Sequence, residues 1–294
     1  MNVRTLRHFL ILCETLHFGR ASRQANISTS ALSRTIRQIE TALNAPLFDR
    51  DNRTVRLTPE GQKFQTYARN AVQQWEQICF ELTDPAEQLQ GTISLYCSVT
   101  ASRSILFDLL SRFRPAHPGV EIRLQTGDPE HAIARVIALE EDLAIAARPD
   151  RLPAGVIFEP ISVSPLVFIA PMESTDVNLA QLPPIEATTW HEIPMILAAS
   201  GIARKRVDGW FRNVGVTPKI YAQVAGNEAI VSMVSLGLGV GVVPKIVLEN
   251  SPLAAEVRIL HVEPALAAYD LGLFTLKRHL KNPLVNEFWS LLAG

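Results

Sequence analysis

One set of side chains in this sequence has the types and spacing expected for reading nucleic acid. Ser28 is placed to cap a helix that runs to about Leu43. On a helical wheel, a single narrow apolar stripe is formed by Leu32, Ile36, Ile39 and Leu43. The opposite face carries hydroxyls and arginines, and a guanidinium fork suits phosphates and guanine edges. The candidate DNA contacts on this helix are Ser28, Ser30, Ala31, Ser33, Arg34 and Arg37.

The residues around that helix predict a winged helix-turn-helix. A short helix over 19–25 and a tight turn precede it, so Phe18–Arg37 forms a pair whose second helix would enter the major groove. A helical hairpin with a solvated polar face is the alternative. After it, a turn at 51–52 and an alternating strand over 55–57 predict a β-wing. The wing would present Arg50, Arg53 and Arg56 to phosphates or a minor groove.

A second set of residues could bind a small anion. Several predicted strands end in turns that carry small or hydroxyl side chains and lead into helices, where free backbone N–H groups favour negative charge. Each turn alone is typical of an ordinary helix cap, but together they predict a pocket for a small carboxylate. Its candidate residues are Ser98, Thr100, Ala101, Ser102, Thr126, Ala147, Ser200, Gly226 and Asn227. The counter-charge could come from Arg103, Arg148 or Arg204, among which the sequence does not choose.

Motifs for catalysis, metals and cofactors are missing from the sequence. It contains no G-x-S-x-G, Walker or H-E-x-x-H pattern, and the glycines at 237, 239 and 241 lack dinucleotide-binding spacing. The seven histidines are scattered, and the three cysteines have neither zinc nor disulfide spacing. We therefore expect no metal, no cofactor and no enzyme activity.

The elements that position these residues fall into three segments. Residues 1–58 form the DNA-binding segment, with helices expected at about 2–16, 19–25 and 28–43. A long helix starts at Pro59 and ends near residue 83, within a linker segment at 59–90. Its heptad seam consists of Phe64, Ala68, Ala71, Trp75, Ile78 and Leu82. The seam predicts dimerisation, and packing on its own domain is the alternative.

Residues 91–294 alternate strands and helices, which predicts an α/β fold with mostly parallel sheets and helices on both faces. The expected strands are 93–97, 120–125, 143–147, 156–161, 166–170, 195–198, 220–224, 240–243 and 269–275, and the expected helices are about 101–114, 129–139, 202–213, 228–236 and 283–292. A break near 162–165 divides this segment into two lobes around a cleft. Lobe I would comprise about 91–162 and 267–294, and lobe II about 163–266. Ligands of such sheets bind beyond the carboxyl ends of the strands.

Charge and hydropathy narrow the class of protein. Residues 1–60 hold nine arginines and no lysine against five acidic residues, a net charge of +4 within a chain of net charge −1. A small basic unit on a mildly acidic body is typical of a DNA-binding module carried by another domain. No apolar run reaches the roughly 18 residues of a membrane helix, and the N-terminus lacks the features of a signal peptide. We expect a cytoplasmic protein with no membrane partner.

The stretch HFGRASRQANISTSALSRTIRQIETALNAPLFDRDNRTVRLTPEG resembles the winged helix-turn-helix of LysR-type transcriptional regulators. The resemblance covers nearly the whole chain, although Ser22 and Ala25 stand where the family usually has alanine and leucine. It implies an N-terminal winged helix-turn-helix, a long linker helix and a two-lobed, periplasmic-binding-protein-like effector domain. Double-stranded DNA, a small acidic inducer and RNA polymerase are the implied partners.

Within the family, segments such as CSVTAS, FRPAHPGVEIRLQTGD and NEAIVSMVSLGLGVGVVPKIVLENSP are similar to activators of branched-chain amino-acid biosynthesis. That similarity implies a homotetramer of two dimers with antiparallel linker helices. It also implies autoregulation and co-induction by 2-acetolactate or 2-aceto-2-hydroxybutyrate.

Three other functions remain as alternatives. The first is a regulator of another pathway that responds to a different small carboxylate, because pocket contacts rather than fold decide the ligand. The second is an enzyme of branched-chain metabolism with an N-terminal extension, against which the missing catalytic motifs argue. The third is a solute-binding transport component, which the two lobes alone would allow.

Overall fold

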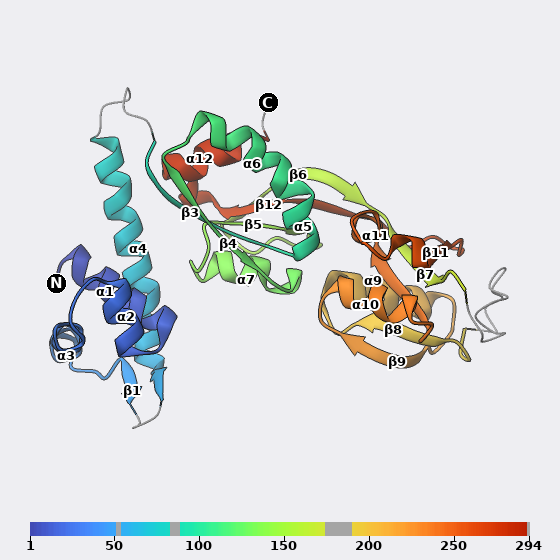
Figure 1. Cartoon of the computed structure of the whole chain (residues 1–294), viewed down its shortest axis with the longest axis horizontal. Coiled ribbons are helices and arrows are strands. Elements are labelled where there is room, and N and C mark those ends of the chain that lie inside the picture. Colours follow the sequence, from blue (N-terminus) through green and yellow to red (C-terminus); the bar gives the residue numbers. More distant parts are fainter. Residues whose placement is uncertain (51–53, 83–88, 174–189, 293–294) are drawn as a thin grey trace. The chain divides into compact units, whose positions relative to one another are not determined.

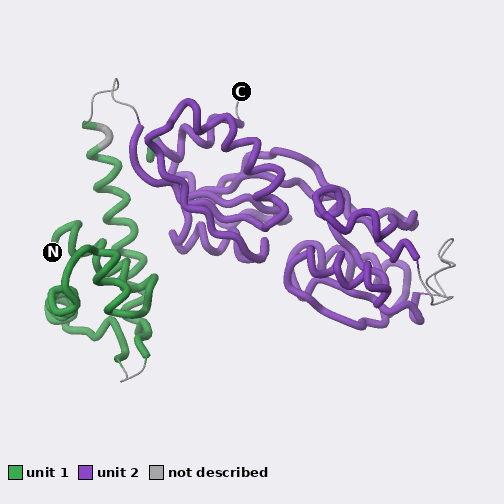
Figure 2. Tube along the Cα trace, viewed as in Figure 1, with its two compact units in different colours: residues 1–87, 281–283 green, residues 88–280, 284–294 purple. Residues whose placement is uncertain are grey.

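The computed structural model describes residues 1–50, 54–82, 89–173 and 190–292. The chain divides into two compact units (Figure 2). Unit 1 contains residues 1–87 and 281–283, and unit 2 contains residues 88–280 and 284–294. No helix of the described residues has the length and apolar character needed to cross a membrane.

The described part of residues 1–87 in unit 1 forms four α-helices and a two-stranded wing. Its helices are α1 (Val3–Thr15), α2 (Phe18–Gln24), α3 (Thr29–Leu43) and α4 (Pro59–Glu81). Its strands β1 (Phe48–Arg50) and β2 (Val55–Leu57) pair antiparallel. Local capping sets the start of α3, because the Ser28 hydroxyl accepts the N–H of Ala31 at 3.1 Å. The predicted helix-turn-helix and wing are both present.

The core of unit 1 follows the predicted apolar stripe of α3 with one exception. Leu32, Ile36 and Ile39 are buried against α1, where Phe9 and Leu12 are fully enclosed. Leu43 was expected in the same stripe, but its side chain is 42% exposed. It is the last residue of the helix, where the chain reverses through Asn44 at a positive φ of 50°. The stripe therefore ends one turn earlier than the wheel predicts.

The long helix α4 divides the predicted heptad seam into two parts. Phe64 and Ala68 are buried in the core of unit 1, and the Phe64 ring lies 4.8 Å from that of Phe9. By contrast, Trp75, Ile78 and Leu82 are 51%, 43% and 80% exposed. The prediction of one continuous dimerisation seam is thus wrong for the first part, because packing on α1 already uses those residues.

The first lobe of unit 2 is a five-stranded sheet with helices on both faces (Figure 1). Its strand order is β4 (Val120–Thr126), β3 (Gly91–Cys97), β5 (Leu143–Ala147), β12 (Tyr269–Leu276) and β6 (Val156–Ser164). One face is covered by α5 (Val99–Arg103), α6 (Ile105–Ala116) and α12 (Pro283–Ser290). The other face is covered by α7 (Ala132–Ile137), which follows the short 3-10 helix η1 (Pro129–His131).

The second lobe repeats this layered arrangement. Its strand order is β11 (Val257–Leu260), β7 (Leu166–Pro171), β10 (Val240–Pro244), β8 (Pro194–Ala198) and β9 (Lys219–Val224). The helix α9 (Gly201–Asn213) packs on one face around an aromatic cluster that includes Trp190, Trp210 and Phe211. The helices α10 (Asn227–Ser235) and α11 (Lys245–Glu249) pack on the other face.

The sheets are mixed rather than mostly parallel, which corrects one expectation. In the first lobe β3 pairs parallel with β4 and β5, but β12 runs antiparallel to β5 and β6. In the second, β7 runs antiparallel to β10 and β11. The reason is that β7 and β12 follow the crossings between lobes and enter each sheet at the carboxyl ends of its parallel strands. Those ends therefore face the other lobe.

Four local elements of unit 2 differ from expectation. The helix expected over 101–114 is broken at Ser104 into α5 and α6, and Ser104 has φ −105° and ψ −85°. The helix expected over 129–139 is a 3-10 turn followed by the short α7. The strand β11 and the helix α11 have no counterpart in the sequence-based prediction.

Candidate functional site

The outward face of α3 carries arginines that the protein itself does not use. Arg34 and Arg37 are exposed, and so is Ser30. Among the described residues, no hydrogen bond or ion pair involves the side chain of either arginine, nor that of Arg56 on the wing. Other arginines of unit 1 are engaged, for example Arg20 with the carbonyl of Thr15 at 2.8 Å. The α3 face thus presents unneutralised positive charge to solvent.

The other predicted residues of α3 cap the helix or are half-buried. Ser28 caps the helix, and its Oγ lies 3.0 Å from the Oγ of Ser30. Ala31 and Ser33 are half-buried at the start of the helix. These positions leave Ser30 and the two arginines as the side chains best placed to reach a partner.

A glutamate carboxylate on α3 joins this helix to the wing. Glu40 accepts the N–H groups of Leu47 and Phe48 at 3.0 and 3.3 Å, and its other oxygen accepts from Arg50 at 2.7 Å. The Arg50 guanidinium also lies 5.2 Å from the centre of the Phe18 ring. The sequence predicted that Arg50 would be free for DNA at the wing, but its side chain is paired with Glu40 while the residue stays exposed. Arg53 lies outside the described residues.

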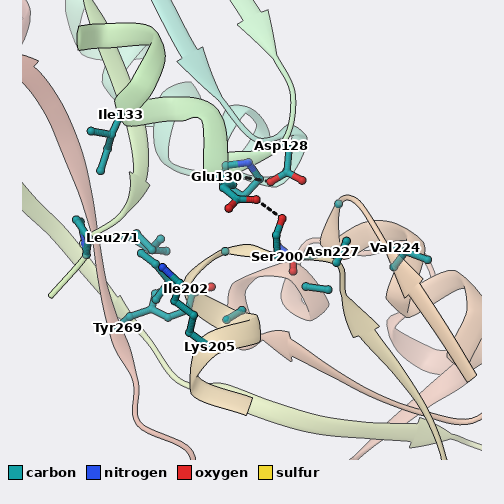
Figure 3. A pocket seen from close by; sticks show the side chains of 18 residues that line it. Asp128, Glu130, Ile133, Ser200, Ile202, Lys205, Val224, Asn227, Tyr269 and Leu271 are labelled. Carbon is teal, nitrogen blue, oxygen red and sulfur yellow. Dashed lines mark hydrogen bonds between the residues drawn. The ribbon is translucent and has the colours of Figure 1, made fainter. Parts of the chain in front are cut away.

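A cavity of about 300 Å³ lies between the two lobes of unit 2 (Figure 3). It is bordered by the loop and helix starts that follow β4, β5, β8 and β9, together with the start of β12. Of the predicted anion-site residues it includes Ala147, Ser200, Gly226 and Asn227. It does not include Ser98, Thr100, Ala101, Ser102 or Thr126. The sequence thus predicted the strand-end region but not which turns would converge on one cavity.

The turn after β3 is filled by a side chain from the other lobe. Glu228, near the start of α10, accepts the Thr100 N–H at 3.0 Å and the Thr100 hydroxyl at 2.5 Å through the same Oε1. The neighbouring hydroxyls bond locally, since Ser98 accepts the N–H of Ala101 at 3.1 Å and Ser102 donates to the carbonyl of Val99 at 2.7 Å. A protein carboxylate therefore occupies the place where an anion was expected.

None of the three candidate arginines borders the cavity. Arg204 bonds Asp208 at 2.8 Å and the carbonyl of Ala198 at 2.9 Å, and Arg148 lies 5.3 Å from the ring centre of Phe158. Arg103 is exposed near the end of α5. The basic side chain that does border the cavity is Lys205. Sequence reasoning missed it, although its position one helical turn into α9 was a usable signal.

Ser200 makes a polar contact at one end of the cavity. It is the N-cap residue of α9 but caps none of that helix's own N–H groups. Its hydroxyl instead donates to the carboxylate of Glu130, which reaches across from the other lobe (Figure 3). Glu130 is itself held by its backbone, because its N–H donates to Asp128 at 3.0 Å. Neither acid was among the predicted site residues.

One side of the cavity is apolar. Ile133, Ile202 and Leu271 border it, and so does Tyr269 (Figure 3). Burial raises the pKa of Tyr269, so its hydroxyl stays protonated at neutral pH. The cavity therefore combines a polar end at Ser200 with an alkyl-accepting side. Among the described residues, no group of three or more His, Cys, Asp or Glu is arranged to hold a metal ion.

Comparison with known protein families agrees with this division of the chain. Residues 3–62 match the model of the bacterial regulatory helix-turn-helix protein of the lysR family. Residues 86–294 match the LysR substrate binding domain. The chain is a LysR-type transcriptional regulator. Members of this family regulate transcription by binding DNA and small-molecule effectors, and they are not enzymes.

Curated relatives of this LysR regulator extend over its whole length. It is 41% identical over 297 residues to the HTH-type transcriptional activator IlvY of Salmonella typhimurium, covering 100% of both chains. It is 40% identical to IlvY of Haemophilus influenzae, covering 99% of this chain and 100% of that one. It is also 32% identical to the regulator IlvR of Caulobacter vibrioides over 83% of this chain and 82% of the relative.

Solved structures show the same fold. A full-length OxyR variant from Pseudomonas aeruginosa matches with a TM-score of 0.73 at 20% identity, over 100% of this chain and 96% of that one. Full-length CbnR in complex with its target DNA matches with a TM-score of 0.65 at 17% identity, over 100% and 99%. The winged helix-turn-helix and the two-lobed effector domain predicted for this LysR regulator are thereby confirmed.

Proposed function

We propose that this LysR regulator is an activator of branched-chain amino-acid biosynthesis of the IlvY type, co-induced by 2-acetolactate or 2-aceto-2-hydroxybutyrate. The observation that carries the proposal is 41% identity to IlvY over the full length of both chains. Residues 1–58 would bind DNA, 59–90 would link and dimerise, and 91–294 would bind the inducer. Autoregulation and a cytoplasmic location belong to the same proposal.

DNA recognition is assigned to α3 and the wing. The exposed side chains of Ser30, Arg34 and Arg37 would meet base edges and phosphates in the major groove. Arg56 and Arg53 on the wing would contact the flanking backbone, which positions the protein without reading sequence. The positive charges of Arg34, Arg37 and Arg56 support this assignment, because arginines that neutralise DNA phosphates release the counterions bound to the DNA.

The assembly is proposed to be a homotetramer of two dimers that contacts RNA polymerase at the promoter. The exposed Trp75, Ile78 and Leu82 on the second part of α4 support dimerisation there. A reader of two half-sites needs its helix-turn-helix units in pairs. The remaining part of the heptad seam is long enough to supply about two turns of contact.

The inducer is proposed to bind in the cavity between the lobes. A cavity of about 300 Å³ suits a small hydroxy-keto acid. Ser200 and Lys205 offer a donor and a positive charge for its carboxylate, and Ile202 and Leu271 offer an apolar side for its methyl groups. The inducer acts on promoter contacts only if it binds two states of the regulator with different affinity.

A footprint of the purified protein on the DNA upstream of its own gene tests the proposal. The DNA is probed with and without 2-acetolactate at modest salt. We expect a protected region whose pattern changes on adding the acid. Protection that ignores 2-acetolactate but responds to another small carboxylate would favour a LysR regulator of a different pathway. Lack of protection would contradict the assignment of α3 as the reading helix.

A further inference from the structure

Two glutamates tie the lobes of unit 2 together in a reciprocal arrangement. Glu130 of the first lobe accepts the hydroxyl of Ser200 in the second. Glu228 of the second lobe accepts the N–H and hydroxyl of Thr100 in the first. Each glutamate lies in the first turn of a helical segment, and each hydroxyl lies at the turn after a parallel strand. Only the first of these ties borders the cavity.

We propose that the Glu130 carboxylate takes the position next to the Ser200 hydroxyl that the effector's carboxylate would take. A small acid then binds by displacing Glu130. This inference rests on the proposed function, in which the cavity takes a small carboxylate. Glu130 is then a built-in competitor that raises the concentration of acid needed to load the cavity.

The Ser200 hydroxyl cannot donate to Glu130 and to the effector's carboxylate at the same time. A serine hydroxyl has one O–H to donate, and in this structure the Ser200 hydroxyl donates to Glu130. A second carboxylate brought within hydrogen-bond distance of the same oxygen would also stand against the charge of Glu130, and like charges in a partly shielded cleft repel. The effector's carboxylate therefore takes the Ser200 hydroxyl only when Glu130 has left it.

Of the two interlobe hydrogen-bonded glutamates, Glu130 is the one that solvent exposure makes easier to release. Glu130 is exposed, so its carboxylate can turn to water at small cost. Glu228 is half-buried and accepts two hydrogen bonds from one residue, one of them from a backbone N–H. Breaking the Glu228 tie leaves that N–H without its partner, which costs more than breaking a single exposed contact.

The charges around the cavity also restrict the class of ligand. Its described border carries two acids, Asp128 and Glu130, and one base, Lys205. One carboxylate seated at Ser200 and balanced by Lys205 leaves Asp128 as the next charged group. A second carboxylate on the ligand would meet Asp128 with no further cation on the described border. The site is thus built for a singly charged acid and discriminates against dicarboxylates.

Calorimetric titration of the full-length protein with 2-acetolactate tests the displacement. We expect the wild type to bind, Glu130→Ala to bind about tenfold more tightly, and Glu130→Gln to fall between them, because glutamine keeps the hydrogen bond but loses the charge. Malate, a dicarboxylate of similar size, should bind the wild type weakly and should bind both variants with higher affinity than the wild type. Thermal unfolding checks that each variant is folded.

Two further variants separate displacement from other causes. Glu228→Gln weakens the second interlobe tie without changing the charge that borders the cavity, so it should leave the affinity within about twofold. Ser200→Ala should weaken the binding of 2-acetolactate. The increase in affinity caused by Glu130→Ala should be smaller when Ser200 is also replaced. A reduced gain in the double variant shows that the two residues act through one seat.

The outcomes distinguish this inference from the function it rests on. Wild-type affinity, or weaker binding, in Glu130→Ala overturns the displacement alone. An equal gain in Glu228→Gln also overturns it, because loosened lobes would then explain both results. A gain in Glu228→Gln without one in Glu130→Ala would place the effector's carboxylate at Thr100 instead. If the wild type binds no 2-acetolactate and its footprint ignores the acid, the proposed inducer itself is wrong.

Discussion

Replacing Glu40 with alanine should loosen the junction between α3 and the wing. One carboxylate there accepts the N–H groups of Leu47 and Phe48 and the guanidinium of Arg50. Leu47 and Phe48 are only 1% and 4% exposed, so water cannot readily replace the lost acceptor. The consequence is two buried donors without partners in a short segment that sets the position of the wing.

The magnitude follows from the three contacts. A buried donor left unsatisfied costs about 1–3 kcal/mol, so two at the lower end cost about 2 kcal/mol. The ion pair adds at most about 1 kcal/mol, because solvent screens an arginine whose side chain is 30% exposed. Glu40→Ala should therefore cost about 3 kcal/mol. Glu40→Gln keeps an acceptor oxygen for the backbone and should cost about 1 kcal/mol.

Amide hydrogen exchange on the full-length protein measures this locally. We expect the Leu47 and Phe48 amides to exchange about a hundredfold faster in Glu40→Ala and less than tenfold faster in Glu40→Gln. Glu76→Ala is the matched control, because its ion pair with Arg7 has both partners about half exposed (49% and 51%). Equal acceleration in the two Glu40 variants would refute the reasoning, since the charge and not the backbone contacts would then dominate.

Three further outcomes are expected from the same structure. Arg34→Ala should weaken operator binding by about 1–3 kcal/mol in a fluorescence anisotropy titration, whereas Arg123→Ala in the other unit should not, and equal losses would contradict the assignment of α3. Trp75→Glu should lower the sedimentation coefficient at micromolar concentration if the exposed part of α4 dimerises, and an unchanged value would refute that interface. Burial raises the pKa of both the Cys13 and Cys97 thiols to about 12, so at pH 8 a thiol reagent should modify neither until denaturant is added, and rapid labelling of either would contradict their burial.

Local signals in the sequence were enough for most elements of unit 1. The Ser28 cap, the apolar stripe of α3 and the proline at the first position of α4 act within one or two turns of the chain, so their effects can be seen without tertiary structure. The strand ends of unit 2 were predicted on the same basis. Mixed strand direction was missed, because it depends on where the chain re-enters each sheet after crossing between lobes.

The sequence predicted the strand-end region in which the cavity lies, but not the side chains that meet there. The sequence placed anion-binding turns at successive strand ends, and Ser200 and Asn227 do border one cavity. It offered no means to foresee that Glu130 would meet a hydroxyl 70 residues away. Nor could it show that Lys205, rather than its neighbour Arg204, would border the cavity, because Arg204 is bound to Ala198 and Asp208.

The sequence by itself determined the family and the basic outward face of α3, because short-range periodicity, caps and charge encode them. Tertiary structure decided which of those residues remain available. It buries Phe64 and Ala68 of the heptad seam, holds Arg50 on Glu40, and fills the Thr100 turn with Glu228. The physical reason is that a hydrogen-bond donor or an apolar side chain is used by whichever partner the fold brings nearest, and that partner can lie more than a hundred residues away in the chain.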